Sequence, residues 1–220
     1  MLALHSYIEH TMLSPLITAA DVERLAEEAL HHQFAGLCVP AYWAKKARRD
    51  LGSSSVKLVV PVGFPLGYQR SEVKLRETEI ALADGADEID AVMNLSAFKT
   101  GVMAWVKGEL AQLAKCCHEK NALLKVILET AYLSDEEIIR ACKLSQDAGA
   151  DFVKTSTGFA PAGATVAHIC LMRASVGPEV GIKASGGIKT LAQAQAMIEA
   201  GADRIGTSSG LAMMHEGGHP

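Results

Sequence analysis

The chain has 220 residues, 49% of them hydrophobic and 5% aromatic, and carries a formal net charge of −4. Its basic residues are scattered, which argues against nucleic acid or an anionic membrane surface as a main partner. No apolar run approaches the ~20 residues of a membrane-spanning helix, and the N-terminus lacks the features of a signal peptide. Five cysteines without a paired framework indicate reduced thiols, so we expect a cytoplasmic protein.

Strand-like and helix-like segments alternate from one end of the chain to the other. Three of the expected helices begin with a capping box, at Thr18, Ser134 and Thr190. The apolar periodicity predicts helices at about 18–30, 42–51, 70–83, 101–119, 134–148, 162–174 and from 190 onward. Strands are expected at 6–11, 36–39, 57–62, 88–92, 123–128, 152–154, 181–184 and 204–206.

The joint between helix and strand is repeated within the chain. Residues 85–90, 149–154 and 201–206 each begin with Gly-Ala-Asp, where glycine supplies the left-handed cap of the preceding helix. Such repetition predicts a βα array. We therefore expect an α/β fold, a (β/α)8 TIM barrel in a single domain over 1–214, followed by a flexible C-terminal tail at 215–220. An open doubly wound sheet is less favoured, because no Gly-x-Gly-x-x-Gly turn opens the first helix.

Three unusual residues fall on the predicted strands where barrel enzymes place their sites. Lys154 ends the sixth strand, Lys183 ends the seventh, and Asp90 lies on the inward side of the fourth. Neighbouring strands are ~4.8 Å apart, so the two ammonium groups can come close and one amine can become neutral. A neutral, buried amine is what imine chemistry needs. The pattern alone equally permits a structural Lys154–Asp90 ion pair, with Lys183 binding a phosphate.

Two glycine-rich turns follow the last two strands, at residues 185–188 and 206–210. Barrels frequently hold a phosphate at this place with bare backbone N–H groups. Ser208 and Ser209 add hydroxyl donors there. The turns therefore predict a phosphate site, although the same residues are compatible with plain tight βα turns.

Several other side chains are weaker candidates. His10 beside Glu9 could be an acid/base pair, but histidines near a chain start are more often structural. The eight histidines show no metal-binding spacing. Cys38 ends the second strand, where we expect a buried and inert thiol. Lys125 and Glu129 share one side of the fifth strand and could pair inside the barrel.

The ordered motifs make the chain resemble the deoxyribose-phosphate aldolases, a family of class I aldolases. One of them is Lys-Thr-Ser-Thr-Gly at 154–158. The resemblance implies reversible cleavage of 2-deoxy-D-ribose 5-phosphate to D-glyceraldehyde 3-phosphate and acetaldehyde. It covers nearly the whole chain through residues 8–13, 62–67, 85–94, 124–130, 152–159, 181–190 and 206–210.

The resemblance also implies roles for individual residues. Lys154 would be the Schiff-base nucleophile, Lys183 would lower its pKa and help to move protons, and Asp90 would act with an ordered water in a proton relay. Glu9 stands where the family usually has Asp, so we leave it outside the catalytic set. Neither a metal nor an organic cofactor is implied, and a homo-oligomer is expected, with a dimer favoured. The phosphate would be surrounded by Gly158, Gly186, Gly187, Gly206, Ser208 and Ser209.

Two other functions stay open at this stage. A different phosphosugar barrel enzyme, an isomerase or a transaldolase-like protein, would keep the phosphate loops. A non-catalytic barrel that binds sugar phosphates is the third interpretation. The two lysines with Asp90 argue against it, because a binding protein has no need of a crowded amine pair.

Overall fold

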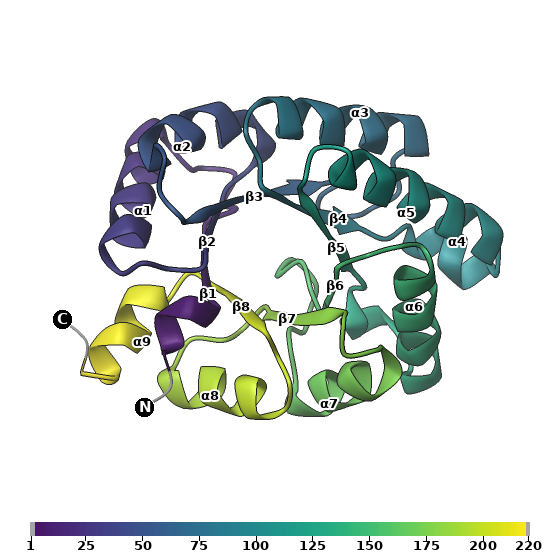
Figure 1. Cartoon of the computed structure of the whole chain (residues 1–220). Coiled ribbons are helices and arrows are strands. Elements are labelled where there is room, and N and C mark those ends of the chain that lie inside the picture. Colours follow the sequence, from purple (N-terminus) through teal and green to yellow (C-terminus); the bar gives the residue numbers. More distant parts are fainter. Residues whose placement is uncertain (1–2, 219–220) are drawn as a thin grey trace.

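In the computed structural model, which describes residues 3–218, eight parallel strands close into a barrel in their sequence order (Figure 1). The barrel closes because β8 pairs with β1. The helices form an outer ring around the strands (Figure 1). The strands are β1 (Ile8–Thr11), β2 (Gly36–Cys38), β3 (Lys57–Val62), β4 (Glu88–Val92), β5 (Leu123–Ile127), β6 (Phe152–Lys154), β7 (Gly181–Ser185) and β8 (Arg204–Thr207).

The expected (β/α)8 barrel in one domain is confirmed. The capping boxes at Thr18, Ser134 and Thr190 are all present at helix starts. The α-helices are α1 (Ala19–His31), α2 (Ala44–Leu51), α3 (Ser71–Ala83), α4 (Leu95–Thr100), α5 (Met103–His118), α6 (Asp135–Asp147), α7 (Val166–Ser175), α8 (Leu191–Glu199) and α9 (Gly210–Glu216). Short 3-10 helices are η1 (Leu4–Tyr7), η2 (Ala41–Trp43) and η3 (Thr130–Tyr132).

The structure corrects the expected C-terminal boundary. His215 and Glu216, which we assigned to a flexible tail, are the last residues of α9. The Glu216 carboxylate accepts a hydrogen bond from the backbone N–H of Leu191 at 2.9 Å, which ties α9 to the start of α8. Residues 219–220 of that tail lie outside the described residues.

Alternation along the strands separates a charged barrel interior from an apolar layer beneath the helices. On β4, Glu88 and Asp90 point inward, whereas Ile89 joins the large apolar cluster. Strand register then places charged groups side by side, since Asp90 pairs with Lys125 and Lys154 pairs with Lys183. The fold therefore gathers acids and lysines from separate strands around one axis. Within residues 3–218, no helix is both long and apolar enough to cross a bilayer.

Candidate active site

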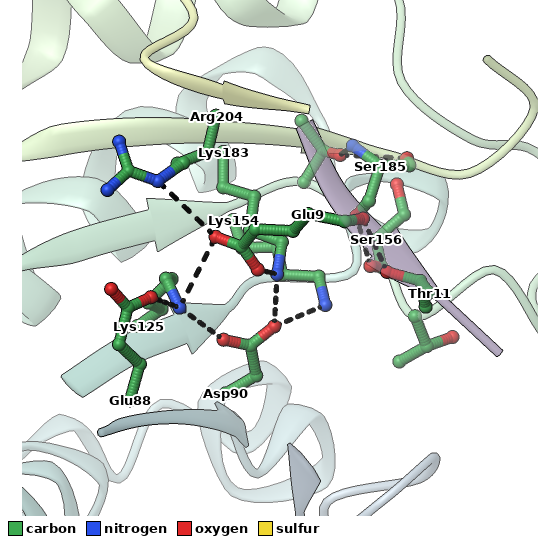
Figure 2. A network of polar contacts seen from close by, with 12 residues as sticks. Glu9, Thr11, Glu88, Asp90, Lys125, Lys154, Ser156, Lys183, Ser185 and Arg204 are labelled. Atoms are coloured by element: carbon green, nitrogen blue, oxygen red, sulfur yellow. Dashed lines mark hydrogen bonds and ion pairs between the residues drawn. The ribbon is translucent and has the colours of Figure 1, made fainter. Parts of the chain in front are cut away.

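One carboxylate lies between the two lysines predicted from the sequence. Asp90 Oδ2 is 2.7 Å from Lys154 Nζ and 2.7 Å from Lys183 Nζ (Figure 2). The two nitrogens are thus separated by no more than twice that distance. Asp90, Lys154 and Lys183 are at most 3% exposed. The structure brings together all three residues that we placed at the reacting centre.

A further lysine from β5 completes the network. Lys125 Nζ lies 3.0 Å from Asp90 Oδ1 and 3.5 Å from Glu9 Oε1, and it also forms an ion pair with Glu88 (Figure 2). The suggested pairing of Lys125 with Glu129 is therefore wrong. Glu129 follows the end of β5 with a left-handed backbone, φ 55°, which takes its side chain out of the alternation of the strand.

The two catalytic lysine candidates differ in their electrostatic surroundings. Burial lowers the pKa of Lys154, the charge of Asp90 opposes this effect, and the charge of Lys183 lowers the pKa further. Burial also disfavours a charged Lys183, but Asp90 and Glu9 together outweigh it and raise the pKa of Lys183. Glu9 forms an ion pair with Lys183. Lys154 is therefore the amine that gives up its proton more readily.

Asp90 and Glu9 stay charged because the neighbouring lysines stabilise their ionised forms. Burial would raise the pKa of Asp90, but Lys125, Lys154 and Lys183 hold it well below its usual range. Burial acts the same way on Glu9, where Lys125 and Lys183 nevertheless lower the pKa. The interior thus gathers three acids and three lysines, with Asp90 shared by all three lysines.

A cavity of about 350 Å³ gives access to this centre at the carboxyl ends of the strands. Of the three lysines inside the barrel, Lys154 lines the cavity, whereas Lys125 and Lys183 do not. The lining comes from the ends of β1, β6, β7 and β8 and from the loops that follow them: Thr11, Met12, Leu13, Ser14, Lys154, Thr157, Gly158, Phe159, Ser185, Gly186, Gly187, Ile188, Lys189, Gly206, Thr207 and Ser208.

The predicted phosphate residues line the cavity, with one exception. Gly186 and Gly187 have left-handed φ values of 85° and 79°, which L side chains rarely adopt. An added Cβ at Gly186 would also approach the Gly163 backbone to 3.0 Å. Ser209 does not line the cavity, and its N–H donates to Thr207 Oγ1 at 2.9 Å.

Sequence reasoning missed two residues of this region, Lys189 and Thr157. Lys189 brings a cation to the cavity directly after the first glycine turn, and its position in that motif could have indicated it. Thr157 lines the cavity, and its backbone N–H donates to the Glu129 carboxylate at 3.2 Å. Only the three-dimensional fold shows that contact, because the two residues follow different strands.

The weaker candidates take structural roles. His10 lies on the outward side of β1 and its Nε2 is 2.7 Å from Glu28 Oε2, so it forms no acid/base pair with Glu9. Cys38 is buried, and burial raises the pKa of its thiol to about 11. A thiol with that pKa remains protonated at neutral pH, as expected for an inert side chain. All five cysteines are free.

The fold and this centre together define a (β/α)8 barrel that holds a buried amine beside a shared carboxylate at the edge of a cavity. The chain matches the DeoC/LacD family aldolase description over residues 4–216. A deoxyribose-phosphate aldolase of Thermococcus gammatolerans is 52% identical over 207 residues, 93% of this chain and 92% of that protein. One from Brevibacillus brevis is 49% identical over 211 residues, 96% and 95% of the two chains.

A solved structure gives the same result. The tetrameric deoxyribose phosphate aldolase of Aeropyrum pernix is similar with a TM-score of 0.90 and 35% identity, covering 98% of this chain and 91% of that one. The chain belongs to the DeoC/LacD aldolase family and is an aldolase. The resemblance drawn from its motifs is confirmed, and neither the isomerase nor the non-catalytic barrel is supported.

Proposed function

We propose that this aldolase reversibly cleaves 2-deoxy-D-ribose 5-phosphate into D-glyceraldehyde 3-phosphate and acetaldehyde through a Schiff base on Lys154. The observation that carries the assignment is the position of Lys154. It is the barrel lysine that lines the cavity, and burial lowers its pKa. The name shared by the curated relatives, which match this chain over 93–96% of its length, supports the substrate.

The first chemical step forms the electron sink. The neutral Lys154 amine attacks C1 of the open-chain aldehyde, and loss of water leaves a protonated imine. The C3 hydroxyl then gives up its proton, the C2–C3 bond breaks, and its electron pair forms the enamine between C1 and C2. Carbon C3 becomes the aldehyde of D-glyceraldehyde 3-phosphate. Protonation of the enamine at C2 and hydrolysis of the imine release acetaldehyde and restore the amine.

Asp90 and Lys183 would support these proton transfers. Asp90 Oδ2 is within hydrogen-bond distance of both ammonium nitrogens, so it can exchange a proton with the Lys154 side of the network. Lys183 remains charged beside Asp90 and Glu9, and its charge favours a neutral Lys154. This chemistry requires neither a metal nor an organic cofactor, because the imine nitrogen itself withdraws the electrons.

The opposite side of the cavity would hold the phosphate. Its lining includes the two glycine turns after β7 and β8, whose backbone can approach an anion closely. Lys189 adds a positive charge to the same lining. We leave Ser209 out of this set because it does not line the cavity. The proposed phosphate residues are Gly158, Gly186, Gly187, Gly206 and Ser208.

We also propose that the chain forms a homo-dimer in the cytoplasm. Symmetric oligomers are common among enzymes of this kind. The outer surface of η2 and α3 offers exposed Tyr42, Val73 and Ile80 to a second copy. Five free thiols, three of them buried, agree with a reducing compartment.

The decisive experiment is reduction with borohydride in the presence of acetaldehyde, analysed by intact mass and peptide mapping. We expect one ethyl adduct, on Lys154. The Lys154→Leu variant is the control and should give no adduct and no cleavage while its circular dichroism stays that of the wild type. An adduct on another lysine, or turnover by Lys154→Leu, would contradict the mechanism.

A further inference from the structure

Glu129 has an unusual backbone and an unusual place. It lies two residues after the end of β5, with φ 55° and ψ 63°, a backbone conformation that residues other than glycine adopt at a cost. Its side chain is 3% exposed. Such a conformation persists only where contacts with the surrounding residues stabilise it.

The Glu129 carboxylate is bound by one residue of the β6–α7 loop. Both of its oxygens are 3.2 Å from the Thr157 backbone nitrogen, and Oε2 also accepts a hydrogen bond from Thr157 Oγ1. Within residues 3–218 it forms no ion pair at 4.0 Å or less. A hollow of about 50 Å³ beside it has mostly apolar walls. Burial raises the pKa of Glu129, and the Thr157 hydrogen bonds oppose this effect.

Thr157 lines both that hollow and the substrate cavity, as does Phe159. Its hydroxyl oxygen accepts a hydrogen bond from the Phe159 backbone N–H at 3.0 Å. A hydroxyl group has one proton to donate and two lone pairs. An ionised Glu129 can only accept, so it takes the single proton of Thr157. Glu129 then takes the Thr157 proton and the Phe159 N–H takes one lone pair. Thr157 Oγ1 therefore keeps one lone pair, with which it can accept a hydrogen bond.

The substrate has a group that fits this acceptor. Thr157 lines the same cavity as Lys154 and Gly158, so it is placed to contact a substrate that extends from the amine to the proposed phosphate loops. In D-glyceraldehyde 3-phosphate, the carbon between the aldehyde and the phosphate-bearing carbon carries a free hydroxyl. That hydroxyl can donate to an oxygen with a free lone pair.

We propose that Glu129 is a specificity-determining positioning residue: its carboxylate orients the Thr157 hydroxyl as an acceptor, so that the site selects an aldehyde bearing a hydroxyl next to its carbonyl. Glu129 acts through Thr157 and does not itself contact the substrate. The inference rests on the proposed function, because it assumes that the cavity binds this aldehyde phosphate.

The alternative is that Glu129 only anchors the loop. The Glu129→Gln variant separates the two roles because it is nearly isosteric. Its amide oxygen can still accept from the Thr157 N–H, so the loop stays anchored. Its amide nitrogen can donate to Thr157 Oγ1, which frees the Thr157 proton to point into the cavity. The acceptor then becomes a donor, and the preference for a hydroxyl donor is lost.

The test compares two aldehydes as partners of acetaldehyde: D-glyceraldehyde 3-phosphate and 3-phosphooxypropanal, which lacks the hydroxyl. We expect the ratio of their kcat/KM values to fall roughly tenfold in Glu129→Gln, the effect of about one hydrogen bond. The Thr157→Val variant should lower the ratio by a similar factor. In the double variant the two effects should not add, because both act through one hydroxyl.

A ratio that stays at the wild-type value in Glu129→Gln would overturn the proposal, as would a further fall when Glu129→Gln is added to Thr157→Val. Borohydride trapping with acetaldehyde keeps this inference separate from the proposed function. An adduct on Lys154 together with unchanged ratios refutes the role of Glu129 alone. Absence of the adduct in the wild type refutes the proposed function.

Discussion

Lys154 and Lys183 occupy paired positions on β6 and β7, yet they differ in their acidic partners and in their access to the cavity. Lys183 contacts two carboxylates, Glu9 and Asp90, whereas Lys154 contacts Asp90 and borders the cavity. The number of acidic partners decides which amine stays charged, and access to the cavity decides which amine can react. Both conditions select Lys154.

This asymmetry leads to a prediction for Lys183→Met. Removing the Lys183 charge removes one cause of the lowered pKa of Lys154 and leaves Asp90 to favour its charged form. We expect the pKa that governs imine formation to rise, and the rate near pH 7 to fall at least about tenfold. The measurement is the rate of borohydride trapping as a function of pH.

Glu9 supplies the control, because Lys183→Met also leaves a buried acid without its main partner. The double variant Glu9→Gln/Lys183→Met restores the balance of charge in the barrel. It should recover the thermal stability while keeping the raised pKa. If the pH profile of Lys183→Met coincides with that of the wild type, Lys183 does not tune Lys154.

The grouping of the three proposed catalytic residues could be predicted because each of them has an unusual position along its strand. Lys154, Lys183 and Asp90 each lie at an inward position of a strand, where burying a charged group costs free energy unless it is paired. The partners of Lys125 could not be predicted in this way. They depend on Glu9 of β1 lying across the closed barrel, 116 positions away along the chain, and on the backbone of Glu129 leaving the strand.

At the scale of elements, helix starts were predictable because capping boxes are local. Ser134 Oγ accepts from the Glu137 N–H, and the Glu137 carboxylate accepts from the Ser134 N–H at 2.8 Å. Ser134→Ala should therefore lower the free energy of unfolding by about 1 kcal/mol, since one helix N–H loses its partner. Urea unfolding measures this change, and kcat should stay unaltered because Ser134 does not line the cavity.

Ser96→Ala is the matched control for this prediction. Ser96 is exposed in the first turn of α4, and its hydroxyl makes no hydrogen bond in the part of the chain that the structure describes. Its replacement should change the stability by less than half as much as Ser134→Ala, because no cap is lost. Equal effects of the two substitutions would show that loss of a hydroxyl, and not of the cap, matters.

Two elements escaped prediction for physical reasons. Residues 95–100 form the separate helix α4, and Gly101, with φ 86°, ends it before α5 begins. The Asn94 side chain caps α4 by accepting from the Ala97 N–H, and Asn is a common residue at such a cap. Helix α9 has no side-chain cap and only seven residues, so its stability comes from packing against η1, β1 and α8.

At the scale of the whole molecule, the barrel depends on the pairing of its first and last strands. His10 lies at this seam, opposite Thr207 in the register between β1 and β8. Its ring is 5.4 Å from that of Phe34, and its Nε2 contacts Glu28 of α1. An added Cβ on Gly210 of α9 would come within 3.1 Å of its Nδ1, so there is little space for water. A proton on this ring would be poorly solvated.

Acidification should therefore weaken the closed barrel at His10. Burial lowers the pKa of His10 below 6.5, although Glu28 opposes this effect. The unfolded chain then takes up the proton first, so this contribution to stability is complete above pH 6.5 and is lost as the pH falls below it. We expect a slope of up to about 1.4 kcal/mol per pH unit from this residue as the pH falls below 6.5.

Urea unfolding across pH 5 to 7.5 measures that slope. His10→Gln, whose amide can still donate to Glu28, should show a shallower dependence on pH than the wild type. His31→Gln is the control, since His31 is an exposed histidine at the end of α1 and should leave the slope nearly unchanged. Parallel curves for the wild type and His10→Gln would show that the seam is not the acid-sensitive part of the barrel. A shallower curve for His10→Gln alone would place the acid sensitivity where the last strand meets the first.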